Sequence, residues 1–122
     1  MQIFKTRLFD NWAQEVDLND ASLTAAVNEI ENRLFDANLG GHIYKKRIAV
    51  GGHGKRGGAR TILAFKMHQK AIFIYGYAKN KRSNISEKEE NALRKLASVY
   101  FAYDETQINQ AIKLGELIKV KS

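Results

Sequence analysis

The chain of 122 residues contains no cysteine, which excludes a disulfide framework and thiolate chemistry and fits a reducing cytoplasm. Proline is also absent, and this absence has no functional interpretation. No run of about eighteen consecutive apolar residues occurs, so no membrane span is predicted. Residues 1–7 hold no apolar run of signal-peptide length, which argues against secretion. Length and a hydrophobic content of 44% predict one folded domain over residues 1–122.

Acidic residues are missing from the centre of the chain. Residues 37–86 contain no Asp or Glu but eleven Lys and Arg residues, whereas the remainder holds nine basic and all thirteen acidic residues. The formal net charge of +7 is therefore concentrated in one segment. Such a segment attracts polyanions without determining the fold, so nucleic acid is the first candidate partner.

Apolar spacing predicts a strand and two helices in the N-terminal third. The strand, which could lie at a sheet edge, and the first helix are expected at residues 2–6 and 8–16. A second helix is expected to begin after Asn19 or Asp20, and its apolar residues continue to Leu34. Gly40-Gly41 is expected to end this helix, because glycine adopts the left-handed conformation without steric cost.

The pattern then changes to strands and returns to helix. Strands are expected at residues 44–50, 60–67 and 71–78, the last two forming an antiparallel hairpin. Ser86–Glu89 matches a capping box, and a further helical segment from Thr106 precedes an apolar tail. The sequence therefore predicts an α+β fold, with a central antiparallel sheet, two N-terminal helices and one or more C-terminal helices.

Residues 51–60 combine a glycine-rich backbone with three permanent cations, Lys55, Arg56 and Arg60. Part of this loop matches G-x-G-x-x-G, but a dinucleotide site needs a helix next and an acidic residue about twenty positions on. Here a strand follows, and the nearest downstream acid is Glu87. A Walker-type phosphate loop is excluded as well, because Arg56 stands where Ser or Thr is required and Ala49 where the first glycine is required.

Two interpretations of this basic loop remain, a solvated connection or an anion-binding loop. Arginine can hold two phosphate oxygens at once, and lysine adds a point charge. The missing acids favour anion binding, as do further cations in neighbouring strands and their ends: Arg47, Lys79, Lys81 and Arg82.

Aromatic residues form a second group in the predicted strand 71–78. Alternation places Phe73, Tyr75, Tyr77 and Lys79 on one face. A tyrosine ring beside a lysine can stack a base while the cation holds its phosphate. We expect Phe73 in the core and one of the two tyrosines at the site.

Histidine offers few candidates for proton transfer. His53 lies in the basic loop and is the one acid–base candidate, the alternative being an inert loop residue. Neighbouring cations disfavour its protonated form, which suits a base. No His, Asp and Glu grouping has metal-ligand spacing, and the predicted site region contains no carboxylate, so neither a metal nor another cofactor is expected.

Several motifs in order resemble a known family. They are RIAV at 47–50, GKRGGART at 54–61, FIYGYAKN at 73–80 and NIS at 84–86. Together they resemble the RelE and HigB toxins of type II toxin–antitoxin systems, in particular the HigB-like branch with a G-K-R-G-G-x-R core. The resemblance covers most of the chain, from the first strand to the helix after Ser86.

The resemblance implies a small α+β domain that acts as a ribosome-dependent mRNA endonuclease in the cytoplasm. Such toxins cut codons in the ribosomal A site and arrest translation, using metal-independent attack of a ribose 2′-hydroxyl on the adjacent phosphate. The implied partners are the ribosome, mRNA and a cognate antitoxin, in this branch typically a HigA-like helix-turn-helix protein. Operator DNA would be bound only through the antitoxin complex, and no membrane is involved.

The resemblance also assigns residues. The implied catalytic residues are Lys55, Arg56, Arg60, Tyr75 and Lys79, and the implied RNA contacts are Lys45, Lys46, Arg47, His53, Tyr77, Lys81 and Arg82. Some family members use histidines and an acid near the C-terminal end of the sheet, and this chain has neither there. An extension over residues 104–122 is expected either to bind the antitoxin or to complete the core.

Two alternative functions are considered for a chain with this basic segment. A non-catalytic RNA- or DNA-binding protein would explain the charge but not the ordered motifs. A ParE-like gyrase poison would share the fold, but members of that branch do not need the cluster of phosphate-binding cations.

Overall fold

The computed structural model describes residues 1–50 and 58–121, which form a mixed sheet of six strands in the order β2-β3-β4-β5-β1-β6. The strands are β1 (Gln2–Thr6), β2 (Ala37–Gly40), β3 (Ile43–Ile48), β4 (Ala59–Lys66), β5 (Lys70–Ala78) and β6 (Leu117–Lys119). Neighbouring strands are antiparallel except β1 and β5, which run parallel. The predicted α+β class is confirmed, while the first strand lies inside the sheet rather than at its edge.

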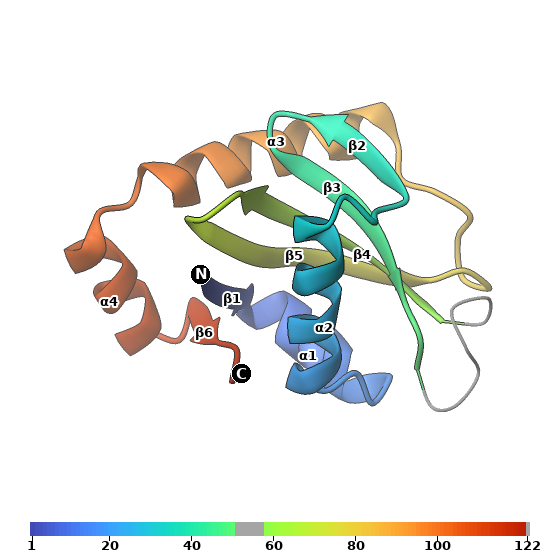
Figure 1. Cartoon of the computed structure of the whole chain (residues 1–122), viewed down its shortest axis with the longest axis horizontal. Helices are drawn as coiled ribbons and strands as arrows, with labels where there is room; N and C mark the ends of the chain where they lie inside the picture. Colours follow the sequence, from blue (N-terminus) through green and yellow to red (C-terminus); the bar gives the residue numbers. More distant parts are fainter. Residues whose placement is uncertain (51–57, 122) are drawn as a thin grey trace.

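Four helices cover the two faces of this sheet (Figure 1). They are α1 (Arg7–Glu15), α2 (Asp20–Glu31), α3 (Glu87–Ala102) and α4 (Glu105–Lys113). One apolar core lies between the sheet and α1 and α2, and a second lies between the sheet and α3 and α4. We call these two sides the α1/α2 face and the α3/α4 face. No helix in the described ranges is long and apolar enough to cross a membrane.

Helix starts follow the predicted capping residues. The Asn19 side chain accepts a hydrogen bond from the Ser22 amide at 2.9 Å and so begins α2. At α3, Ser86 and Glu89 form the predicted capping box, in which each side chain accepts a hydrogen bond from the other residue's backbone amide. The local sequence therefore determines where both helices begin.

The end of α2 differs from the prediction. The helix ends at Glu31, and Arg33 adopts a left-handed conformation with φ 64°. Leu34, expected on the apolar stripe, is 58% exposed. The chain then forms β2, a strand that the periodicity did not predict, and Gly40-Gly41, with positive φ angles, forms the β2–β3 turn instead of a helix end.

The C-terminal segment packs against the rest of the molecule. Ile108 and Ala111 of α4 and Leu117 of β6 are buried in the core of the α3/α4 face. Val120 is buried in the core of the α1/α2 face. The segment after Asp104 thus contributes to both cores.

Candidate functional site

A β-bulge in β5 decides which way its aromatic side chains point. Ile62 of β4 pairs with Tyr75, but Leu63 pairs with Phe73, so Ile74 is an extra residue on β5. Bulges are common beside functional sites because they redirect side chains. The prediction that Phe73, Tyr75 and Tyr77 share one face is therefore wrong. Phe73 lies in the core of the α1/α2 face, whereas Tyr75 and Tyr77 pack on the α3/α4 face.

Gly76 allows β5 to lie close to α1 at this point. A Cβ atom at Gly76 would lie 2.1 Å from the Trp12 ring, closer than any real contact. The bare backbone thus accommodates Trp12 on the α1/α2 face while the two flanking tyrosines point to the α3/α4 face.

Three predicted site residues form one row across the sheet. Arg47 of β3 pairs with Arg60 of β4, and Arg60 pairs with Tyr77 of β5. Residues directly opposite each other on antiparallel strands point to the same face. Because Tyr77 lies on the α3/α4 face, Arg47 and Arg60 point there as well.

Arg60 and Tyr77 are buried with unsatisfied polar atoms. Their exposed fractions are 8% and 3%, and among the described residues neither Arg60 Nη1 nor the Tyr77 hydroxyl has a hydrogen-bond partner. No carboxylate in the described ranges forms an ion pair with Arg60. Burial raises the pKa of the Tyr77 hydroxyl, although Arg60 and Arg82 oppose the shift. A buried polar atom without a partner is costly, so this pair is suited to receive an anionic ligand.

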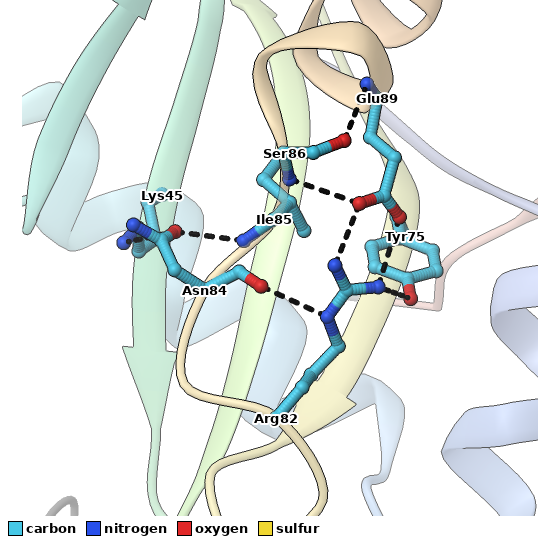
Figure 2. A network of polar contacts seen from close by, with 7 residues as sticks. All are labelled: Lys45, Tyr75, Arg82, Asn84, Ile85, Ser86 and Glu89. Atoms are coloured by element: carbon cyan, nitrogen blue, oxygen red, sulfur yellow. Dashed lines mark hydrogen bonds and ion pairs between the residues drawn. The ribbon is translucent and has the colours of Figure 1, made fainter.

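Arg82 is held beside Tyr75 by the Glu89 carboxylate (Figure 2). Its Nη1 and Nη2 donate to Glu89 Oε2 and Oε1 at 2.8 and 2.6 Å, and Nη1 also donates to the Tyr75 hydroxyl at 3.1 Å. Its guanidinium carbon lies 5.8 Å from the Tyr77 ring centroid. Hydrogen bonds from Arg82 and from the Ser86 amide lower the pKa of Glu89 to about 2, so this carboxylate is ionised at neutral pH.

Asn84 connects this network to β3 (Figure 2). The Arg82 Nε donates to the Asn84 carbonyl at 2.9 Å, and Lys45 Nζ donates to the Asn84 side-chain oxygen at 3.1 Å. The same oxygen accepts from the Ile85 amide at 2.9 Å. The segment between β5 and α3 is thus tied both to the sheet and to the start of α3.

The row continues to an ion pair at its β3 end. Arg47 donates from its backbone amide to Asp36 Oδ2 at 2.6 Å and from Nε to Asp36 Oδ1 at 3.1 Å. Partial burial alone would raise the pKa of Asp36, but these two hydrogen bonds outweigh it and lower the pKa. Asp36 directly precedes the acid-free segment, so part of the Arg47 charge is balanced locally.

Six of the predicted site residues come together on the α3/α4 face: Lys45, Arg47, Arg60, Tyr75, Tyr77 and Arg82. We call them the cationic cluster. Lys46 does not join it. It is 4% exposed on the other face, where its Nζ lies 2.6 Å from Glu29 Oε1 and 2.8 Å from the Leu34 carbonyl oxygen. The expectation that Lys46 contacts RNA is therefore not supported.

The remaining predicted residues are located as follows. Lys79 and Lys81 are exposed just after β5. His53, Lys55 and Arg56 lie outside the described residues. Within the described ranges, no three His, Asp or Glu side chains are grouped as metal ligands would be.

Asn84 and Glu89 contact the predicted cations Lys45 and Arg82 through the network, but neither was predicted as a site residue. Glu89 was identified only as part of the capping box, and its pairing with Arg82 joins residues seven positions apart through a turn. The sequence offers one indication of a role for Glu89, because it is among the first acidic residues after the acid-free segment and could balance its charge.

Comparison with known protein families gives a match over nearly the whole chain. The chain matches the family model described as the RelE toxin of the RelE/RelB toxin–antitoxin system over residues 1–120. A search of curated protein sequences finds no significant match. The family match includes all the described elements, from β1 to β6. The chain therefore belongs to the RelE toxin family and is the toxin of a toxin–antitoxin system.

Proposed function

We propose that this toxin is a ribosome-dependent mRNA endonuclease that cleaves codons in the ribosomal A site. The observation that carries the proposal is the buried, unpaired Arg60 beside Tyr77, at the centre of the cationic cluster. A scissile phosphate bound there would supply the anion that the Arg60 charge lacks among the described residues. Preorganised cations that meet developing negative charge are usually the largest catalytic contribution.

The chemistry we propose is attack of a ribose 2′-hydroxyl on the adjacent phosphate, which releases the 5′-oxygen of the next nucleotide. Arg60 would bind the phosphate, with Lys55 and Arg56 as further phosphate contacts and His53 as a candidate base. Lys79 would assist the leaving oxygen. No metal takes part in this scheme.

The two tyrosines take different roles in this proposal. Tyr77 is too deeply buried to stack a base, whereas Tyr75 is half-buried and its hydroxyl accepts a hydrogen bond from Arg82. The Tyr75 hydroxyl proton therefore remains available for a phosphate oxygen, and its ring is the better candidate for stacking a base. Arg82 is oriented by Glu89, and one of its five N–H groups is not used in the network.

We also propose that the chain belongs to the HigB-like branch, with a HigA-like helix-turn-helix antitoxin as partner and the ribosome as platform. The G-K-R-G-G-x-R motif at 54–60 supports the branch assignment. The antitoxin complex, rather than the toxin alone, would bind operator DNA.

The test is cleavage of a defined mRNA in a purified translation system, with the 3′ ends of the products mapped and chemically identified. We expect cuts at the A-site codon and products that end in a 2′,3′-cyclic phosphate. Arg60→Ala is expected to lower the rate by about 10²–10³. Lys95→Ala, which removes the same charge from an exposed site on α3, is expected to leave it unchanged.

Three results would contradict the proposal. Equal cleavage of free and ribosome-bound mRNA would exclude ribosome dependence. Binding of RNA without any cleavage would favour a non-catalytic protein. Inhibition of gyrase supercoiling with mRNA left intact would identify a gyrase poison.

A further inference from the structure

A second recess lies at the end of the sheet opposite the cationic cluster. It is a groove of about 640 Å³, within the size range of small-ligand sites, formed where the end of α2, the β2–β3 turn and the β4–β5 turn meet. The residues that matter for the argument are Arg33, Phe35, Asn38, Tyr44, Lys66 and Gln69. Figure 1 shows the β4–β5 turn at the far end of the sheet from the start of β4, where Arg60 lies.

The groove presents flat rings. Phe35 is 37% exposed, and its ring packs edge-on against Tyr44 at a centroid distance of 5.0 Å. Tyr44 packs edge-on against Phe65 at 5.9 Å. An edge-to-face series of this kind fixes the rings, and the exposed Phe35 ring at its end offers a surface on which a planar group can stack.

The polar residues of the groove are cations and amides. Arg33 carries a permanent positive charge, and Asn38 and Gln69 each offer a donor and an acceptor. Lys66 also lines the groove, but its Nζ lies 5.0 Å from the centroid of the Phe101 ring of α3. None of the described residues that line the groove is Asp or Glu. This combination of ring, amide and cation matches a nucleotide, because the ring can stack the base, the amides can pair with the base edge and the cation can hold the phosphate.

Backbone strain gives an independent indication. Arg33 and His42 line the groove with φ angles of 64° and 65°, and His68, with φ 63°, lies between two lining residues. Glycine or asparagine would occupy such left-handed positions at lower cost. No described residue accepts a hydrogen bond from the Arg33 guanidinium, so the fold gains nothing visible from this side chain. Strained residues of this kind concentrate at binding sites.

We propose that this groove is a second nucleotide-binding site, which holds a base on Phe35 and a phosphate near Arg33. Arg60 and Lys66 lie six residues apart on β4, roughly 20 Å at about 3.3 Å per residue, so one nucleotide cannot reach both sites. The groove therefore binds a different part of an RNA molecule from the cationic cluster. This inference requires RNA binding but not cleavage.

The experiment is a titration of the isotope-labelled toxin with AMP, a probe that cannot be cleaved, followed by amide NMR. Amide shifts are expected at residues 33–38, 42–44 and 66–69. Inorganic phosphate at the same concentration as AMP is expected to cause weaker shifts. Phe35→Ala is expected to weaken AMP binding in the groove about tenfold, since stacking on an aromatic ring is typically lost on alanine substitution.

Arg33→Gly separates binding from stability. Removing a side chain from a left-handed position is expected to raise Tm by about 3 °C while weakening AMP binding about fivefold. Asp17→Gly is the matched control, because Asp17 also has a positive φ (57°) but does not line the groove. This control is expected to raise Tm similarly and to leave AMP binding unchanged. Lys95→Ala controls for loss of a charge.

Three outcomes would overturn the proposal. The first is AMP shifts confined to the cationic cluster. The second is unchanged AMP affinity in both Phe35→Ala and Arg33→Gly. The third is displacement of AMP by hexaglutamate with no dependence on Phe35, which would identify a site for acidic chains. Absence of mRNA cleavage with groove binding intact would contradict only the endonuclease proposal.

Discussion

Arg60 and Lys46 are buried cations on neighbouring strands that the structure uses differently. Lys46 is enclosed by α2 and pairs with Glu29, so its charge is satisfied within the fold. Arg60 lies on the other face with Nη1 unpaired, at a site of several converging cations. Breaking a satisfied buried contact costs stability, whereas removing an unpaired buried charge does not. At the residue scale, Lys46 therefore stabilises the fold and Arg60 is the better candidate for ligand binding.

Glu89 gives a residue-scale prediction. The folded protein holds the pKa of Glu89 at about 2, below its ordinary value of 4.5, because Arg82 and the Ser86 amide donate hydrogen bonds to it. The ionised carboxylate therefore stabilises the fold above pH 4.5, and this contribution is lost as the pH falls towards 2. The Tm difference between wild type and Glu89→Gln is expected to be constant from pH 7 to 5 and to disappear near pH 2.

The same Glu89→Gln variant should slow mRNA cleavage about tenfold at neutral pH, because the ion pair that orients the Arg82 side chain is lost. Glu87→Gln is the matched control, since Glu87 is also in the first turn of α3 but is exposed. If Glu89→Gln and Glu87→Gln showed the same pH profile and the same cleavage rate, Glu89 would have no positioning role.

At the scale of elements, β5 connects packing on one face with the site on the other. The bulge at Ile74 turns Tyr75 and Tyr77 towards the α3/α4 face, and Gly76 between them receives Trp12 of α1. Any displacement of α1 or β5 at this point would move both tyrosines relative to Arg82. The position of the tyrosines thus depends on a contact with the opposite face.

Gly76→Ala tests this connection. The added methyl group would lie 2.1 Å from the Trp12 ring, and overpacking is expected to lower the free energy of unfolding by about 3 kcal/mol. Gly40→Ala is a useful comparison, because no atom lies within 4 Å of its Cβ position and only its φ of 82° opposes the change. Its expected cost is about 1 kcal/mol. Urea unfolding measures both, and equal losses would contradict the close packing of Trp12 on β5.

Local patterns predicted many of these elements but not their irregularities. Alternation located β3 and the β4–β5 hairpin, and the Ser86–Glu89 motif located the start of α3. The end of α2 was missed because Arg33, not glycine, takes the left-handed position. The bulge at Ile74 has no local signal, since it depends on pairing with β4.

At the scale of the whole molecule, the acid-free segment contains the whole cationic cluster, but it does not determine how the charges of that cluster are balanced. Lys45, Arg47 and Arg60 lie on one face of the sheet, yet Asp36 and Glu89, from just outside that segment, pair with Arg47 and Arg82. Alternation along the strand places Lys46 on the opposite face from Lys45 and Arg47. The pairing of Lys46 with Glu29, however, depends on how α2 packs on the sheet. Tertiary contacts therefore decide which cations remain for a ligand.

The central claim is that Arg60 lies in the fold to bind RNA rather than to stabilise the protein. The most direct measurement compares Arg60→Met with Lys46→Met, for unfolding by urea and for single-turnover cleavage of ribosome-bound mRNA. Arg60→Met is expected to unfold with unchanged or higher free energy and to cleave about 10²–10³ more slowly. Lys46→Met is expected to lose about 2 kcal/mol of stability and to cleave at the wild-type rate. Wild-type cleavage by a folded Arg60→Met variant would contradict the account.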